Sequence, residues 1–180
     1  YNHNAFPLVK EIQKQIVIAK VPFEIICIDD ASKNEYPENL KIDTIPNCSY
    51  SKLKKNIGRS KIRNLLADKS RYGWLLFLDA DVIPYSENFI QKYLSHLKKE
   101  TDAKVICGGI TYKKEKPSKQ HLLRWTYGKF KEDIPIKTKL NDPYKYFFSS
   151  NFIIHKEIFN SVKFDENIIE YGYEDTVFSM

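Results

Sequence analysis

Two acids separated by an alanine close the most apolar stretch of the chain. Five large apolar residues, Trp74 to Leu78, run together and end at Asp79-Ala80-Asp81. Because side chains alternate along a strand, Asp79 and Asp81 should point to the same side. Two such carboxylates repel each other unless a cation joins them, and a hard divalent ion that is shared with substrate phosphates would do so. The pattern predicts either a metal site or a polar loop that follows a buried strand.

A second apolar stretch also ends at acids. Phe23 to Ile28 is predicted to be a strand, and Asp29 and Asp30 follow it directly. Asp favours turns, so one such strand end would be weak evidence for a site. Two strand ends of the same design are stronger evidence, because open α/β sheets bind ligands beyond the carboxyl ends of their strands.

A helix beginning near Ser60 follows the turn Asn56-Ile57-Gly58 and carries Arg63 on its first turns. The N-terminus of a helix offers free N–H groups and a partial positive charge, both of which suit a phosphate. We therefore expect this helix to start close to an anionic ligand.

Strands and helices are predicted to alternate through the first two thirds of the chain. The expected helices start near Leu8, Ser60 and Ser86, and the expected strands span residues 23–28, 40–45, 74–78, 104–112 and 146–154. Apolar residues near Leu122 to Phe130 suggest a further short amphipathic helix or a lid. The alternation predicts βαβ units and a mostly parallel sheet in three layers.

The composition is that of one globular domain. The 180 residues are 42% hydrophobic and 14% aromatic, and no apolar run approaches the roughly 20 residues that span a bilayer. The three cysteines, Cys27, Cys48 and Cys107, are far apart and form no CxxC pair. This argues against a zinc site or a disulfide framework and favours a reducing compartment. We expect a cytoplasmic location, including the inner face of the membrane.

The net charge is +6, and lysine dominates it. Basic clusters can attract nucleic acid, anionic lipid or a phosphorylated small molecule, although a solvated lysine-rich surface is the plainer interpretation. The two densest clusters are Lys52, Lys54, Lys55, Arg59, Lys61 and Arg63, and then Lys113, Lys114, Lys116 and Lys119.

Several blocks of the chain occur in an order that is typical of a known family. They are Tyr1-Asn2, Glu24 to Ser32, Asn56-Ile57-Gly58 with Arg63-Asn64, Phe77 to Asp81, Asn151 before an apolar strand, and Phe164-Asp165-Glu166 followed by Gly172-Tyr173-Glu174-Asp175. With these blocks the chain resembles the family 2 glycosyltransferases of the GT-A fold over nearly its whole length. The resemblance implies an α/β fold with three α/β/α layers and a mostly parallel, Rossmann-like central sheet.

The resemblance also implies a domain organisation. Residues 1–180 would form a single GT-A domain. Members of the family usually have a buried strand just before the position of Tyr1-Asn2, and helices that shape the acceptor site after the position of Glu174-Asp175. Both are expected to be lacking from residues 1–180, and peripheral membrane association is expected through such missing segments.

Site roles follow from the resemblance residue by residue. Tyr1 and Asn2 match the loop that covers the nucleobase of the donor. Asp29 and Asp30 match strand-end acids near the nucleobase and ribose, and Arg63 matches a position near the nucleotide pocket.

The remaining acids match the metal and catalytic positions of the family. Asp81 matches the acid that coordinates Mg²⁺ or Mn²⁺, and Asp79, the other acid of the metal pair, matches a position near the ribose. Asp175 matches the general base of inverting members. Glu174 would either orient Asp175 or contact the acceptor.

The implied activity is metal-dependent, inverting transfer of a sugar from a nucleotide-diphosphate sugar, with a UDP-sugar favoured. The hydroxyl acceptor would be a glycan or a lipid-linked molecule, in polysaccharide or glycan biosynthesis. A sugar-phosphate nucleotidyltransferase is the alternative enzyme, but it needs a glycine-rich phosphate loop, and Tyr1 to Pro7 contains no glycine. A basic nucleic-acid-binding module would not need acids at two strand ends, so no nucleic-acid partner is expected. A catalytically inactive, sugar-binding member is the third alternative.

Overall fold

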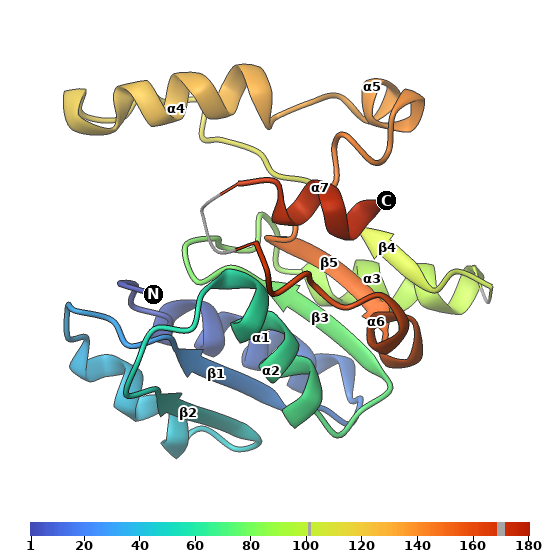
Figure 1. The fold of residues 1–180 in the computed structure, drawn as a ribbon. Coiled ribbons are helices and arrows are strands. Elements are labelled where there is room, and N and C mark those ends of the chain that lie inside the picture. The colour runs from blue at the N-terminus through green and yellow to red at the C-terminus, as the bar shows by residue number, and fades with distance from the viewer. Residues whose placement is uncertain (101, 169–171) are drawn as a thin grey trace.

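The computed structural model describes residues 1–100, 102–168 and 172–180 (Figure 1). Helices and strands alternate through the first two thirds of the chain, as predicted. In chain order the elements are α1 (Phe6–Ala19), β1 (Ile25–Asp29), the 3₁₀-helix η1 (Pro37–Thr44), β2 (Cys48–Lys52), α2 (Arg59–Lys69), β3 (Trp74–Leu78), α3 (Phe89–Lys99), β4 (Val105–Cys107), α4 (Lys119–Lys131), α5 (Ile136–Asn141), β5 (Asn151–His155), α6 (Lys156–Val162) and α7 (Glu174–Ser179).

The strands form two hydrogen-bonded groups. β1 and β2 pair in parallel, whereas β5 lies between β3 and β4 and is antiparallel to both. β3 and β4 therefore run in one direction, and Figure 1 shows β1 and β3 pointing the same way. β5 is the reversed strand in an otherwise parallel arrangement.

The alternating side chains of β3 supply two apolar cores, one on each face. Leu75 and Phe77 pack against Ala67 of α2, and the Phe77 ring stacks on Phe152 at a centroid distance of 4.9 Å. Leu76 and Leu78 face the other side, where they pack against a cluster of α1 and α3 residues, Leu8, Ile12, Ile16 and Ile90. Helices thus cover both faces of the strands, which is the predicted three-layer order.

The strand predicted at residues 40–45 is wrong. Pro37 begins the 3₁₀-helix η1 there, and Ile42 is fully buried while Leu40 is 66% exposed. Proline fixes φ near the helical value and suits the first position of a helical turn. The next strand forms later, at Cys48–Lys52, and pairs with β1.

Two other predicted strands are shorter than expected. The strand predicted at 104–112 ends at Cys107, and the strand predicted at 146–154 begins at Asn151. The backbone of Gly108 lies directly against the Asn151 and Tyr93 side chains, where a Cβ atom would come within 2.2 Å of Asn151. The glycine thus permits a close approach to Asn151, whose carbonyl accepts the Gly108 N–H (2.9 Å) just after the end of β4.

A cavity of about 290 Å³ lies between β1 and β3 and is lined by apolar side chains of both strands and of α1 and α2. Within the described residues, neither strand pairs along the edge that faces the other. Ile25 to Ile28 are consequently only half-buried, as are Trp74, Leu76 and Leu78. Both faces of β3 are thus packed against helices, while its unpaired edge is open along this cavity.

The strand expected before Tyr1 stays a prediction, and this cavity is where it would fit. Asn2 donates its N–H to Ser32 Oγ (2.5 Å) just beyond the carboxyl end of β1, so a strand leading into Tyr1 would run parallel to β1.

We expect a designed Val/Ile extension of six or so residues before Tyr1 to raise the melting temperature by at least about 5 °C. Each buried Val or Ile contributes about 1.5–3 kcal/mol, and 1 kcal/mol corresponds to about 2–4 °C at this size. Calorimetry would measure the melting temperature, and a Gly/Ser extension of equal length is the control. Equal melting temperatures for the two extended proteins would refute the strand site.

Candidate active site

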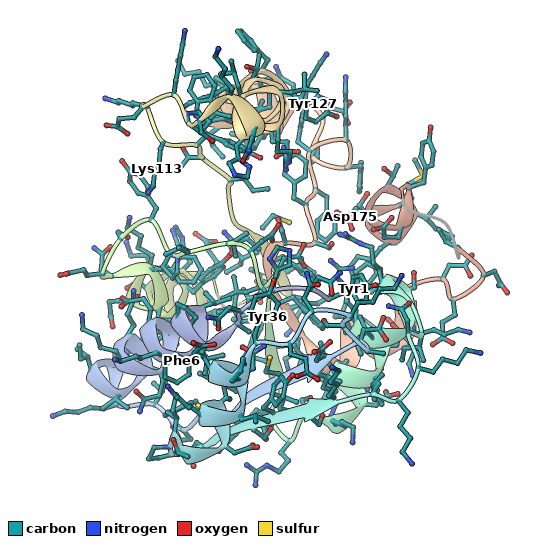
Figure 2. The ribbon with its side chains drawn as sticks, turned by 90° about the vertical axis from the view of Figure 1, so that its left-hand side faces the viewer. Tyr1, Phe6, Tyr36, Lys113, Tyr127 and Asp175 are labelled. Carbon is teal, nitrogen blue, oxygen red and sulfur yellow. The ribbon has the colours of Figure 1, made fainter. Side chains whose placement is uncertain are left out.

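The candidate site lies at the carboxyl ends of β1 and β3. Asp29 is the last residue of β1, and Asp79 follows β3 directly, where its N–H donates to the Ser150 carbonyl (3.2 Å). Arg59 in the first turn of α2 contacts Asp79, and Glu174 in the first turn of α7 contacts Arg59, so both turns lie at the same region. In Figure 2, Asp175 of α7 lies between the sheet and the helices α4 and α5.

Arg59, the first residue of α2, joins two of the acidic segments. Its Nε atom lies 2.5 Å from Glu174 Oε1, and its Nη2 atom lies 3.7 Å from Asp79 Oδ2. Glu174 is buried and also accepts a hydrogen bond from the Gly172 N–H (3.0 Å). One guanidinium therefore ties the acid after β3 to the acid that begins α7.

Arg63, one turn further along α2, is buried and donates to Asp79 Oδ1 (2.9 Å). Its guanidinium lies over the Phe164 ring, 5.3 Å from the centroid. A planar guanidinium suits carboxylates and aromatic faces alike. The predicted nucleotide-pocket residue is thus an ion-pair partner of the predicted Asp-x-Asp motif.

Asp81 differs from Asp79 in its surroundings, because its side chain is exposed. In the described part of the chain, no group of three or more His, Cys, Asp or Glu side chains could hold a metal ion. Mg²⁺ is commonly held by one or two carboxylates together with water and substrate phosphates, so an exposed Asp81 fits that donor set. Asp79 already pairs with two arginines, and its predicted role as a metal ligand stays a prediction.

Asp29 is held as an ionised acceptor. Its carboxylate accepts the Ser32 N–H (2.8 Å) and the Tyr50 hydroxyl (3.1 Å). Burial favours the neutral acid, but the hydrogen bonds from Ser32 and Tyr50 outweigh it, and the pKa of Asp29 lies below its ordinary value. Burial and the neighbouring Asp29 raise the pKa of Tyr50 to about 12.

Asp30 holds the loop that precedes α2. Its two carboxylate oxygens accept the N–H groups of Ile57 (2.7 Å) and Gly58 (2.9 Å), and Asn56 donates to its carbonyl (2.9 Å). Gly58 adopts φ +91°, a left-handed conformation that favours glycine. Asp30 therefore positions Arg59, and any contact between Asp30 and a nucleotide stays a prediction.

The N-terminal residues are anchored beside β1. Asn2 Oδ1 accepts the N–H groups of Lys33 (2.9 Å) and Asn34 (3.2 Å), and the Tyr36 hydroxyl donates to the Asn2 carbonyl (3.0 Å). Tyr1 is 51% exposed and precedes this anchor. Both residues lie by the loop after β1, next to Asp29 and Asp30, and their contact with a nucleobase stays a prediction.

Asp175 lies in the first turn of α7 beside Glu174. Its Oδ2 atom accepts the Ser149 N–H (3.0 Å), which fixes the carboxylate. Its Oδ1 atom is buried and has no hydrogen-bond partner among the described residues. A held carboxylate with one unengaged oxygen can accept a proton from a third group.

A continuous set of contacts therefore connects the three acidic segments. It runs from Asp30 through Gly58 to Arg59, and from Arg59 to Asp79 and Glu174. Sequence reasoning placed Arg59 only in a basic cluster and assigned no role to Ser149. The signal that could have found Arg59 is its place four residues before Arg63, which puts both side chains on one face at the start of a helix.

Comparisons with known proteins identify the family and the fold. The family model described as glycosyl transferase family 2 matches residues 3–162. Among solved structures, the crystal structure of S. aureus TarS 1-349 matches with a TM-score of 0.64 and 21% identity, covering 99% of this chain. The chain spans about half of that structure, 52% of its length. No curated protein gives a significant match. The matches confirm the predicted α/β GT-A fold and the resemblance stated above.

Proposed function

The chain belongs to glycosyl transferase family 2, and from this premise we propose that it is an inverting enzyme. It moves a sugar from a nucleotide-diphosphate sugar, with UDP favoured, to a hydroxyl of a glycan or lipid-linked acceptor. The family match favours sugar transfer over the nucleotidyl transfer considered above. The proposed process is polysaccharide or glycan biosynthesis.

The surroundings of Asp175 are the observation that supports its role as the general base. A hydroxyl is a poor nucleophile at neutral pH, and a positioned carboxylate accelerates its attack by about 10²–10⁴-fold. Asp175 is fixed through Oδ2 by the Ser149 N–H, while Oδ1 is buried without a partner in the described residues. Oδ1 is therefore the atom that we assign to accept the proton of the acceptor hydroxyl.

The reaction needs one displacement. As Asp175 takes the hydroxyl proton, the acceptor oxygen forms a bond to the anomeric carbon, and the bond from that carbon to the diphosphate oxygen breaks. The nucleoside diphosphate leaves with the electron pair of the broken bond. Attack opposite the leaving group inverts the anomeric centre and requires no second catalytic carboxylate.

The donor is assigned to the carboxyl ends of β1 and β3. Asp29, Asp30, Tyr1 and Asn2 would hold the nucleoside beside β1. Asp81 would hold Mg²⁺ or Mn²⁺, which neutralises charge on a diphosphate leaving group when it is bound.

Glu174 is assigned a positioning role. It is buried and paired with Arg59, so it fixes the start of α7 and with it Asp175. This favours orientation of Asp175 over contact with the acceptor, the two alternatives that the sequence left open.

A thermal-shift panel of UDP-, GDP- and dTDP-sugars with Mn²⁺ tests the proposal. A donor at 100 times its Kd stabilises the folded protein by about 2.7 kcal/mol, which is about 5–10 °C at this size. We expect that shift with UDP-sugars and Mn²⁺, and a smaller one when EDTA replaces Mn²⁺. The anomeric configuration of the sugar released by slow hydrolysis, read by NMR, tests inversion. The absence of any shift and of any released sugar would contradict the proposal.

A further inference from the structure

The segment of residues 113–145, here called the basic arm, carries the whole net charge of the protein. It contains ten Lys or Arg residues and four Asp or Glu residues, and the rest of the chain has nineteen of each sign. The arm includes α4 and α5, which lie together at one end of the molecule, beyond α7 and away from the sheet (Figure 1). The protein is therefore strongly polarised, with a neutral body and a cationic end.

The arm also exposes a stripe of large apolar side chains. Leu123, Tyr127 and Phe130 of α4 follow one another at helical spacing, and their exposed fractions are 83%, 57% and 75%. Residues at i, i+4 and i+7 share one face of a helix, and such a face normally packs against a core. Ile136 and Leu140 of α5, at i and i+4, are similarly exposed.

The opposite face of α4 is fixed. The backbone of Gly128 packs against the Tyr112 ring, where a Cβ atom would clash at 2.0 Å, and the Trp125 indole donates to the Lys113 carbonyl (2.9 Å). Arg124 lies over the Tyr112 ring and pairs with Glu132 (3.0 Å). These contacts therefore keep Leu123 and Phe130 pointing outward, because α4 cannot rotate about its axis without losing them.

Charge and apolar surface together indicate what covers the stripe. A second copy of the arm would bring two segments of charge +6 together, which like-charge repulsion opposes. A polyanion such as nucleic acid would match the lysines but would leave Leu123, Ile136 and Leu140 in water. A surface of anionic lipid suits both, since apolar side chains enter the acyl boundary while Lys and Arg contact the head groups.

We propose that the basic arm is a docking surface for anionic lipid membranes. Leu123, Phe130 and their neighbours enter the interface, and exposed lysines, including Lys119, Lys131 and Lys137, contact the head groups. In the described residues, no helix is long and apolar enough to cross a bilayer. This proposal does not depend on the proposed sugar transfer.

Sedimentation with vesicles tests it. We expect the protein to bind an equimolar mixture of phosphatidylcholine and phosphatidylglycerol and not phosphatidylcholine alone. Raising the salt from about 0.1 M to about 1 M should release it, because the Debye length falls from about 10 Å to about 3 Å. Equal binding to both kinds of vesicle, or no binding to either, would overturn the proposal.

Two sets of variants separate the charge from the apolar stripe. Changing Lys119, Lys131 and Lys137 to Gln should weaken vesicle binding by about 100-fold, at about 1 kcal/mol per lysine. The matched control changes Lys10, Lys14 and Lys92, which are exposed on the body. Changing Leu123 and Phe130 to Ser should weaken binding at least 10-fold, with the exposed Leu40 and Ile83 as the matched pair.

Circular dichroism melting should be unchanged in all four variants, since every altered side chain is exposed. Equal losses in the variants of arm and body would overturn the proposal. The proposal would also be overturned if polyphosphate or single-stranded DNA bound more tightly than vesicles and if the Leu123 and Phe130 substitutions left that affinity unchanged. Self-association through the stripe, measured by light scattering, would overturn it as well.

Discussion

Replacing Asp175 by asparagine should lower kcat by about 10²–10⁴-fold and leave donor affinity close to that of the parent protein. The amide has nearly the shape of the carboxylate, and its oxygen can still accept the Ser149 N–H that now holds Oδ2. The asparagine amide, however, cannot act as a base and take a proton from the acceptor hydroxyl. Product formation and calorimetric titration with the nucleotide would measure the two quantities separately.

Asp68→Asn is the matched control for that substitution. Asp68 lies on α2, and its exposed pair with Lys163 (3.2 Å) lies outside the cluster around Arg59. Exposed pairs of this kind contribute little, typically below about 1 kcal/mol. An Asp175→Asn protein that loses donor binding together with its fold would reveal a structural role, and an unchanged kcat would place the base elsewhere.

Replacing Asp81 by alanine should weaken Mn²⁺-dependent binding of a UDP-sugar by about 100-fold or more. The residue is exposed beyond the carboxyl end of β3, and we assign it as the carboxylate that holds the ion. Loss of groups that only support metal ligands costs about 10–100-fold, so loss of a ligand should cost at least as much. Titration calorimetry with UDP-sugar in Mn²⁺ and in EDTA would measure the effect.

The variant Glu87→Ala removes the same charge from an exposed position in the loop after β3 and serves as control. Affinity in EDTA should be nearly the same for Asp81→Ala and the parent protein, because only the metal-linked part of binding is lost. If Mn²⁺ raised the donor affinity of Asp81→Ala as strongly as that of the parent, the metal assignment would be wrong.

The network around Arg59 explains why the effects of Asp81→Ala and Asp175→Asn should be measurable separately from each other and from a loss of the fold. Asp79 and Glu174 are both held by Arg59, whereas Asp175 is held by the Ser149 backbone and Asp81 is exposed. Changing Asp81 or Asp175 therefore leaves the ion pairs that connect α2, β3 and α7 in place. Changing Arg59 would instead remove the cation facing the buried Glu174, an arrangement that is costly to break.

Local sequence patterns were sufficient to predict the structure where the conformation of a segment depends mainly on its own residues. The apolar run from Trp74 to Leu78 predicted β3, and the change from apolar to acidic residues predicted that Asp29 and Asp79 lie at strand ends. They failed at residues 40–45, where the apolar spacing resembled a strand and Pro37 began a 3₁₀-helix. Near Leu122 to Phe130 they predicted a short amphipathic helix or a lid, and the structure has a helix there whose apolar stripe faces solvent.

By itself, the sequence determined which segments are strands and helices over much of the chain, that the fold is α/β, and that acids follow β1 and β3. The reason is that hydrophobic period and turn residues act over a few neighbouring positions. Only the tertiary structure decided that Arg59 contacts both Asp79 and Glu174, that Asp30 holds Gly58, and that Ser149 holds Asp175. Those contacts join residues that are distant in the chain, and their partners depend on how the elements pack.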